Sequence, residues 1–280
     1  MRAMDYREYP PPAALAAHVE CLWRLRQPRP AGASQTIYPD GRCELIVHLA
    51  APPRCWDAVY GWHRQARTLF AAQRVVAVRL EAKGPLDCVG IRLRPAVSNL
   101  LVRGAALRHR DRVVDLAPLD PTLSRALARS AHELVRGAPQ PVWKLLARRC
   151  ENILIDARVA AAIERLERDA GRTRIDSLAR TAALSMRGFQ LRFRAAVGLT
   201  PKEFARLTRL QATLRALDAG DAKLAELASD GGFADQAHAT RELRRVTGHT
   251  PARLRAALRQ DRDGDTAVRL AAAFVRGYAG

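Results

Sequence analysis

The chain has 280 residues, 48% of them hydrophobic, and a formal net charge of +19 from 47 Lys and Arg against 28 Asp and Glu. A chain of this length can form two domains with separate cores. It contains no run of eighteen apolar residues, and its first residues lack an apolar stretch of signal-peptide length. These features exclude the membrane-spanning and secreted classes, so a cytoplasmic protein is expected.

Residues 1–138 have the pattern of a β-rich domain. Short apolar stretches separated by Pro-Asp-Gly and Lys-Gly-Pro turns predict strands over Val19–Leu25, Glu44–Leu49, Arg74–Glu81 and Cys88–Leu93. Helical periodicity predicts helices at Ala96–Leu101, Pro121–Arg136 and Val142–Leu154. Beyond Gly137–Pro141 nearly every segment has helical period. We therefore predict an α+β chain with a β-rich, barrel-like first domain and an all-α second domain of about seven helices.

The first half offers little for catalysis. Glu44 and His48 share a strand face but lie about 13 Å apart at the strand rise, too far to chelate one metal ion. The five cysteines form no CxxC pair and are interpreted as buried, reduced side chains, with a thiol-based sensor as the alternative. We therefore expect no enzyme activity, no metal and no cofactor. Candidates for a small-molecule pocket are His48, Trp56, Trp62, His63 and Arg92.

The second half contains an internal repeat. Gly198-Leu199-Thr200-Pro201 recurs fifty residues later as Gly248-His249-Thr250-Pro251. Upstream of each copy, Leu178-Ala179 and Leu227-Ala228 open a helix, a turn and a second helix. Self-similarity on this scale indicates a duplicated supersecondary unit. Two helix-turn-helix units in tandem predict a DNA-binding protein.

The second helix of each unit separates apolar from polar residues by helical spacing. The predicted inward residues are Met186, Phe189, Phe193, Ala196 and Val197 in the first unit and Ala239, Leu243 and Val246 in the second. The predicted outward residues are Arg187, Gln190, Leu191 and Arg194 in the first unit and Ala237, Thr240, Arg241, Arg244 and Arg245 in the second. Both outward faces therefore offer hydrogen-bonding side chains to a ligand.

Helix boundary signals agree with this division. Ser185 and Asp235 can cap the two helices at their N-termini, and Gly198 and Gly248 suit their C-termini, as Gly231-Gly232 does for the short helix before the second unit. Thr200-Pro201-Lys202-Glu203 has the form of a capping box with proline at the first helical position. It predicts a long helix running to about Leu217 that joins the two units.

These residues resemble the DNA-binding domain of the AraC/XylS family of transcription regulators over roughly Asp156 to Leu258. The resemblance rests on Ile175–Val197 with Gly-Leu-Thr-Pro, Leu224–Ala228, Gly232–Gln236, Thr240-Arg241 and Gly248–Pro251. It implies a domain of about seven helices whose two recognition helices enter successive major grooves of double-stranded DNA. Such helices must lie about 34 Å apart, a separation that a rigid connecting helix can maintain.

The same resemblance assigns base-reading roles to Arg187, Gln190 and Arg194 in the first recognition helix and to Gln236, Thr240 and Arg241 in the second. Arg can contact guanine and Gln can contact adenine in the major groove. Two residues depart from the family pattern. Leu191 replaces a polar groove residue, and Ala239 replaces a bulky core residue, for which we expect Phe233 or a neighbour to compensate. Arg172–Arg215 holds ten basic and two acidic residues, which favours phosphate contact.

The first half resembles the small β-barrel domain, of uncharacterised role, that precedes such a domain in one AraC-like subgroup. The residues concerned are Val19–Trp23, Tyr38–Gly41, Glu44–Ile46 and Val89–Pro95. The family analogy implies that this domain senses a small molecule or mediates contacts in a homodimer. The effector itself remains unknown.

The sequence thus predicts a DNA-binding transcriptional regulator, an activator by resemblance, that acts with RNA polymerase at a promoter. We expect a sensor or dimerisation domain at 1–138, a connecting helix at 139–155, the DNA-binding domain at 156–258 and a tail at 259–280, where Thr266–Gly280 could form a short helix. The alternative is a small-molecule-binding or metal-dependent, cupin-like module whose helical half is an interaction platform.

Overall fold

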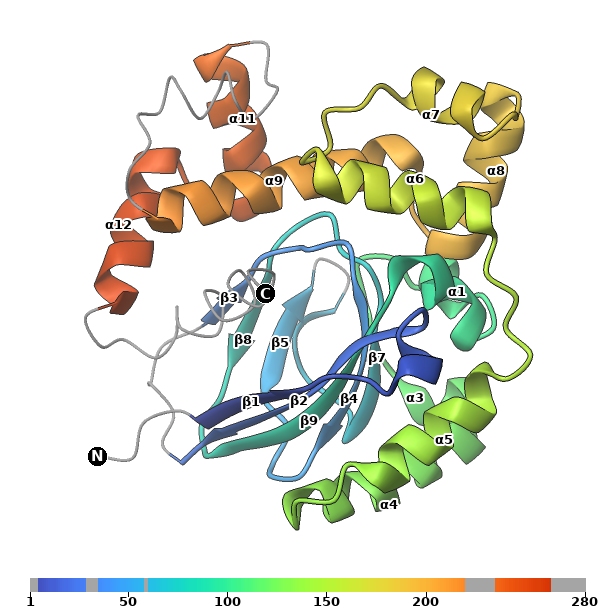
Figure 1. Ribbon diagram of the computed structural model, residues 1–280. Coiled ribbons are helices and arrows are strands. Elements are labelled where there is room, and N and C mark those ends of the chain that lie inside the picture. Colours follow the sequence, from blue (N-terminus) through green and yellow to red (C-terminus); the bar gives the residue numbers. More distant parts are fainter. Residues whose placement is uncertain (1–4, 29–34, 58–59, 220–234, 263–280) are drawn as a thin grey trace.

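The computed structural model describes residues 5–28, 35–57, 60–219 and 235–262 (Figure 1). The predicted fold class is confirmed, because the described strands all lie between Asp5 and Asp115 and the rest of the described chain is helical. In Figure 1 the later helices form a layer across one end of the β-rich part. The predictions for Leu224–Ala228, Gly231-Gly232, Phe233 and Thr266–Gly280 fall outside the described residues.

The β-rich part contains two antiparallel sheets. Their strand orders are β1-β2-β9-β4-β7-β10 and β3-β8-β5-β6. The strands are β1 Asp5–Tyr9, β2 Val19–Gln27, β3 Gln35–Ile37, β4 Cys43–His48, β5 Arg54–Asp57, β6 Gly61–Arg64, β7 Thr68–Ala71, β8 Val78–Glu81, β9 Leu86–Leu93 and β10 Val113–Asp115. The strands predicted at Val19–Leu25, Glu44–Leu49 and Cys88–Leu93 are thus confirmed.

The strand predicted at Arg74–Glu81 is only half correct. β8 begins at Val78, because backbone donors just before it are bonded outside the sheet. The Val75 amide donates to the Asp111 carboxylate (2.6 Å), and the Ala77 amide donates to the carbonyl of Val246 in the helical part (2.9 Å). This connection between β7 and β8, residues 72–78 with the start of β8, is called the β7–β8 segment below.

Helices cover one face of the six-stranded sheet. They are η1 Ala13–Leu15, η2 Pro95–Val97, α1 Ser98–Leu101, α2 Ala105–Arg108, α3 Leu116–Leu119, α4 Pro121–Val135 and α5 Gln140–Cys150. The predicted helices near Ala96, Pro121 and Val142 are confirmed within a few residues. Trp143 and Leu146 of α5 join Leu45 and Phe70 in one apolar core, so the helix expected to connect the domains packs on the first of them.

Six helices of the second part lie within the described ranges. They are α6 Ala157–Arg168, α7 Ile175–Thr181, α8 Met186–Val197, α9 Pro201–Ala219, α11 Gln236–Thr247 and α12 Pro251–Arg262. The predicted long helix is α9, and α8 and α11 are the second helices of the two repeats. None of the helices in the described ranges combines the length and the apolar character needed to cross a bilayer.

The predicted helix ends are confirmed by their hydrogen bonds. Ser185 accepts from the Gly188 amide at 3.1 Å, and Asp235 accepts from the His238 amide at 2.6 Å. Gly198 and Gly248 adopt φ of 93° and 77° at the C-termini of α8 and α11, a conformation that costs other residues energy. Local sequence therefore determines where both helices begin and end.

The capping box at the start of α9 is also present. The Glu203 carboxylate accepts from the Thr200 amide at 2.9 Å, and the Glu203 amide donates back to the Thr200 hydroxyl at 3.3 Å. This reciprocal pair satisfies two donors at the N-terminus of the helix that joins the repeats.

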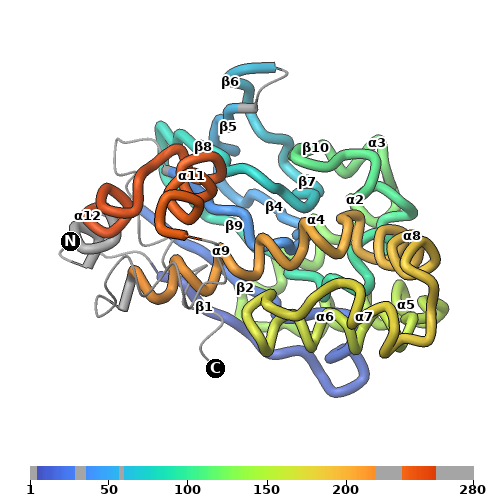
Figure 2. Tube along the Cα trace, turned by 90° about the horizontal axis from the view of Figure 1, so that it is seen from above, coloured from blue at the N-terminus to red at the C-terminus, as the bar shows by residue number. Residues whose placement is uncertain are grey.

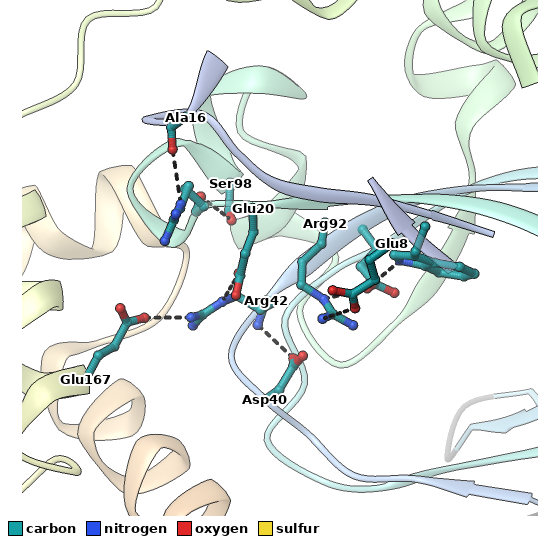
Figure 3. A network of polar contacts seen from close by, with 11 residues as sticks. Glu8, Ala16, Glu20, Asp40, Arg42, Arg92, Ser98 and Glu167 are labelled. Atoms are coloured by element: carbon teal, nitrogen blue, oxygen red, sulfur yellow. Dashed lines mark hydrogen bonds and ion pairs between the residues drawn. The ribbon is translucent and has the colours of Figure 1, made fainter. Parts of the chain in front are cut away.

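The two parts of the molecule share a polar and apolar junction. Arg42, whose side chain is 5% exposed, donates to Glu20 of β2 and to Glu167 of α6, each at 2.7 Å (Figure 3). The Gln211 side chain of α9 donates to the Pro39 carbonyl at 2.8 Å. Tyr38, Val75 and Ala96 of the first part belong to the apolar core of the helical part. The parts therefore pack as one body rather than as beads on a linker.

Gly90 in β9 gives a sharp test of this packing. A Cβ built there would lie 2.0 Å from Cζ2 of the Trp23 ring, which is 2% exposed and held by a hydrogen bond from Nε1 to Glu44 (3.1 Å). We expect Gly90→Ala to lower the free energy of unfolding by about 1–3 kcal/mol, measured by urea denaturation. Gly84→Ala is the control, because a Cβ there meets no described atom within 4 Å. Equal midpoints for both variants would contradict the expectation.

Candidate nucleic-acid interface

The first recognition helix, α8, separates its faces largely as predicted. Phe189, Phe193, Ala196 and Val197 are buried, whereas Arg187, Gln190, Leu191 and Arg194 are exposed. Met186 is the exception: it is 39% exposed, so its predicted inward position is wrong. It follows the N-cap directly and lies at the end of the apolar face, where α7 no longer covers it.

The second recognition helix, α11, has the same division. Ala239, Leu243 and Val246 are buried, and Ala237, Arg241, Arg244 and Arg245 are exposed. Thr240 is half-buried. Gln236, Thr240 and Arg241 surround one shallow hollow together with Asp235 and Ala237. Three predicted base-reading residues therefore lie side by side at the N-terminal end of α11.

Both recognition helices lie at opposite ends of α9. Figure 1 shows α8 and α11 on the side of α9 that faces away from the strands, and Figure 2, viewed from that side, shows α9 running between them. The N-terminus of each helix is capped and carries the positive end of the helix dipole. The arrangement offers two capped helix ends with exposed Arg and Gln on one face of the molecule.

The C-terminal ends of both helices contact the β-rich part. The Gln73 side chain donates to the Val197 carbonyl, and Asn99 Nδ2 donates to the Ala195 carbonyl at 2.8 Å. In α11 the Val246 carbonyl accepts from the Ala77 amide. The last carbonyls of a helix lack intrahelical partners, so these bonds complete the helices. Sequence reasoning missed them, since more than a hundred residues separate donor from acceptor.

An ion pair adds to this attachment. Arg110 of the first part lies 2.7 Å from the Glu203 carboxylate at the start of α9. Burial would raise the pKa of Glu203, but the Thr200 hydrogen bonds and the Arg110 guanidinium outweigh it and hold that pKa below its usual range. Glu203 thus serves both the capping box and the junction.

The β-rich part encloses an apolar cavity of about 130 Å³ between its sheets. Its apolar lining includes Trp23, Leu25, Ile37, Ile46, Leu69, Val78, Leu80 and Leu86. His48 and Glu44 also line it; His48 bonds to Gln65 (3.0 Å), and burial lowers its pKa to about 4. Glu44 accepts from Trp23 and from Arg92 (3.0 Å). The polar groups of this cavity are therefore neutral or already bonded.

The pocket predicted from His48, Trp56, Trp62, His63 and Arg92 does not form, because only His48 lines this cavity. Trp56 and Trp62 are paired across β5 and β6 and face outward, with the Arg79 guanidinium 5.0 and 5.5 Å from their ring centroids. His63 lies on the other face, 3.2 Å from the Cys55 sulfur. Strand alternation therefore separates residues that the sequence grouped by type.

Neither a metal site nor a reactive thiol appears in the described part of the chain. No three His, Cys, Asp or Glu side chains there converge as metal ligands, so nothing favours the cupin-like alternative. All five cysteines are buried and unpaired with one another. Burial raises the pKa of Cys21 and of Cys88 to about 12 and that of Cys150 to about 11, so these thiols stay protonated near neutral pH.

Comparison with known proteins identifies both parts. Residues 178–257 match a family model described as Helix-turn-helix domain, and residues 7–115 match one described as Domain of unknown function (DUF6597). A Streptomyces lividans protein named as an AraC-like transcription regulator is 35% identical over 99 residues. These residues are 35% of this chain and only 33% of that relative's length. The chain belongs to the AraC-like family.

Solved structures include two that resemble parts of this AraC-like chain. The DNA-binding domain of AdpA, solved in complex with a target DNA, is 29% identical and covers 39% of this chain and 98% of its own, with a TM-score of 0.36. ToxT from Vibrio cholerae is 9% identical and covers 91% of this chain and 98% of its own, with a TM-score of 0.46.

Two residues depart from the AraC-like pattern in the way that the sequence indicated. Leu191 is 61% exposed on the outward face of α8, where an apolar side chain gains nothing from the core. Ala239 is 5% exposed, inside the second unit. The compensation expected from Phe233 lies outside the described residues. Leu191 is therefore available to a partner, whereas Ala239 is not.

Glu203 makes the attachment of the AraC-like domain depend on pH. Because its pKa is lower in the folded than in the unfolded protein, its stabilisation is complete above about pH 4.5 and is lost as the pH falls through the folded-state value. Glu203→Gln keeps the capping box but removes the charge. We expect it to lower the free energy of unfolding by about 0.5–1 kcal/mol at pH 7 and by less below pH 4.

Chemical denaturation at several pH values measures this difference. Glu164→Gln, which changes an exposed glutamate on α6, is the control and should be nearly neutral throughout. A Glu203→Gln effect that is as large at pH 3.5 as at pH 7 would refute the role of the charge.

Proposed function

We propose that the protein is a sequence-specific DNA-binding transcriptional regulator that reads two adjacent major-groove segments of a promoter. The observation that supports this most is the pair of capped helices, α8 and α11, at opposite ends of α9 with their Arg and Gln side chains exposed on the same face. A helix of this kind fits the major groove, and two of them at a fixed separation read successive turns.

Six side chains carry the proposed readout. They are Arg187, Gln190 and Arg194 on α8 and Gln236, Thr240 and Arg241 on α11. Arg and Gln suit bidentate contacts with guanine and adenine, and the exposed Leu191 suits a thymine methyl group. Arginines around α8, such as Arg174 and Arg180, are more suited to phosphates, which position the protein without reading sequence.

The wider role follows from the family. We infer that the protein activates transcription with RNA polymerase in the cytoplasm and catalyses no reaction itself. Its proposed units are a sensor or dimerisation domain at 1–138, a connecting helix at 139–155, the DNA-binding domain at 156–258 and a tail at 259–280. A second copy of the chain is a proposed partner through the first domain.

Base readout is tested with Arg187→Ala and Gln236→Ala in the full chain. Each should relax sequence preference in one half of the binding site by about 1–3 kcal/mol, because each removes one bidentate base contact. Footprinting on DNA flanking the protein's own gene locates the site, and binding titrations with substituted duplexes measure preference.

Arg136→Ala is the matched control, since it removes an exposed positive charge on α4, away from both recognition helices. It should leave the preference unchanged. If both test variants keep the wild-type preference in both halves, the base-reading assignment is wrong. Protection of one groove only, without sequence preference, would refute the proposed function itself.

We also propose that the cavity between the sheets receives the signal. A cavity of about 130 Å³ approaches the size that holds a single benzene ring. A charged ligand would lose hydration without gaining a free counter-charge, because Glu44 and Arg42 are already in ion pairs. The proposed effector class is therefore a small, uncharged, mainly apolar ring compound with one hydrogen-bonding group.

Thermal unfolding with single-ring compounds tests this class. Phenol, an uncharged probe, should raise the midpoint, and benzoate, of similar shape but charged, should not. Leu80→Phe enlarges a side chain that lines the cavity and should abolish the phenol effect. A phenol shift that persists in Leu80→Phe, or an equal benzoate shift, would place the binding elsewhere.

A further inference from the structure

Three carbonyls at the C-terminal ends of the recognition helices accept hydrogen bonds from the β-rich part. Val197 and Ala195 of α8 accept from the side chains of Gln73 and Asn99, and Val246 of α11 accepts from the amide of Ala77. Gln73 is 0% exposed and Asn99 8%, so water cannot readily replace these donors. The ends of both reading helices are thus fixed by groups outside the DNA-binding domain.

Donors for both helices come from the same short stretch of chain. Gln73 bonds α8 and Ala77 bonds α11, and four residues of extended chain span at most about 14 Å. Val75, between them, is 7% exposed and belongs to the apolar core of the helical part. The β7–β8 segment therefore bridges the two repeats at a point remote in sequence from α9, their covalent link.

The same segment has a second face toward the cavity. Ala72, Arg74 and Val78 line the cavity between the sheets, whereas Gln73, Val75 and Ala77 contact the helical part. Successive side chains of an extended chain point to opposite sides, which accounts for the alternation. A displacement of the segment by a cavity occupant would thus move the donors that hold both helices.

The segment is anchored where it would otherwise yield. The Asp111 amide donates to the Gln73 carbonyl at 3.0 Å, and the Asp111 carboxylate accepts from the Val75 amide. The neighbouring Arg110 pairs with Glu203 at the start of α9. Movement of the β7–β8 segment would therefore be transmitted to the connecting helix as well.

We propose that the β7–β8 segment sets the separation of the two recognition helices and makes it depend on the contents of the cavity. The inference rests on the proposed function and assigns positioning roles to Gln73 and Asn99, neither of which touches DNA. Its consequence is a protein that distinguishes binding sites by the number of base pairs between their two halves.

Site spacing is measured with full-length protein and duplexes that carry the two footprinted segments at their natural separation or with one base pair added or removed. Wild type should favour the natural separation by roughly tenfold or more, because each base pair rotates one half relative to the other. Gln73→Met, which keeps the side-chain length but not the hydrogen bond, should reduce this ratio to about threefold or less. Asn99→Ser is a second variant with the same expected direction.

Val76→Ala is the matched control, since Val76 lies in the same segment but is 38% exposed. It should keep the wild-type spacing ratio. Base preference within each half should be unchanged in every variant. A folded Gln73→Met protein with the wild-type ratio, or a Val76→Ala protein with the same loss, would overturn the positioning role. Failure of wild type to bind any two-part site would instead refute the proposed function, and this inference with it.

Dependence on the cavity is tested by a double-mutant cycle of Leu80→Phe with Gln73→Met. Leu80 lines the cavity from β8 and does not belong to the apolar core of the helical part. Leu80→Phe should change the spacing ratio at least threefold in the wild-type background and less than 1.5-fold in the Gln73→Met background. No change in wild type, or equal changes in both backgrounds, would overturn the coupling.

Discussion

Phe204 lies where three parts of the molecule meet, and the placement of the recognition helices depends on it. Its ring is 1% exposed and its centroid lies 5.8 Å from that of Phe193 in α8, which in turn lies 5.9 Å from Phe189. On the other side, Gly41 of the β-rich part leaves room for the same ring, since a Cβ there would lie 3.3 Å from it. Loss of a buried Phe side chain typically costs about 3–5 kcal/mol. Here it would also remove the seat of the first reading helix.

Local features of the helical half could be predicted from sequence because their causes are local. Ser185, Asp235 and the Thr200–Glu203 box form their hydrogen bonds within four residues, and Gly198 and Gly248 meet a backbone requirement of their own helix. Spacing of apolar residues then orients α8 and α11. The fold class and the exposure of the proposed reading residues follow from these facts alone.

The features that sequence could not predict depend on contacts between distant segments. Strand propensity at residues 74–77 is real, but the Ala77 amide bonds α11 instead of a strand. Trp56, Trp62 and His63 are chemically alike as ligand-binding residues, yet their sides of the sheet depend on a register set by partner strands. Glu44 and His48 were correctly placed on one face, and only the second sheet shows that this face borders a cavity.

Net charge is a poor guide to DNA contact in this chain because many arginines hold the protein together. Arg42 and Arg110 join the two halves, Arg149 pairs with Asp120 at 2.7 Å, and Arg206 pairs with Glu242 at 3.0 Å. The two glycines of the repeat complete the picture. A side chain at Gly198 would collide with Gln73 and Ala106, whereas one at Gly248 meets no described atom within 4 Å, and α11 is tied to the front half through main-chain atoms alone. The second unit can therefore be exchanged for one of different base preference without rebuilding the rest, so new promoter specificities should evolve, or be engineered, there first.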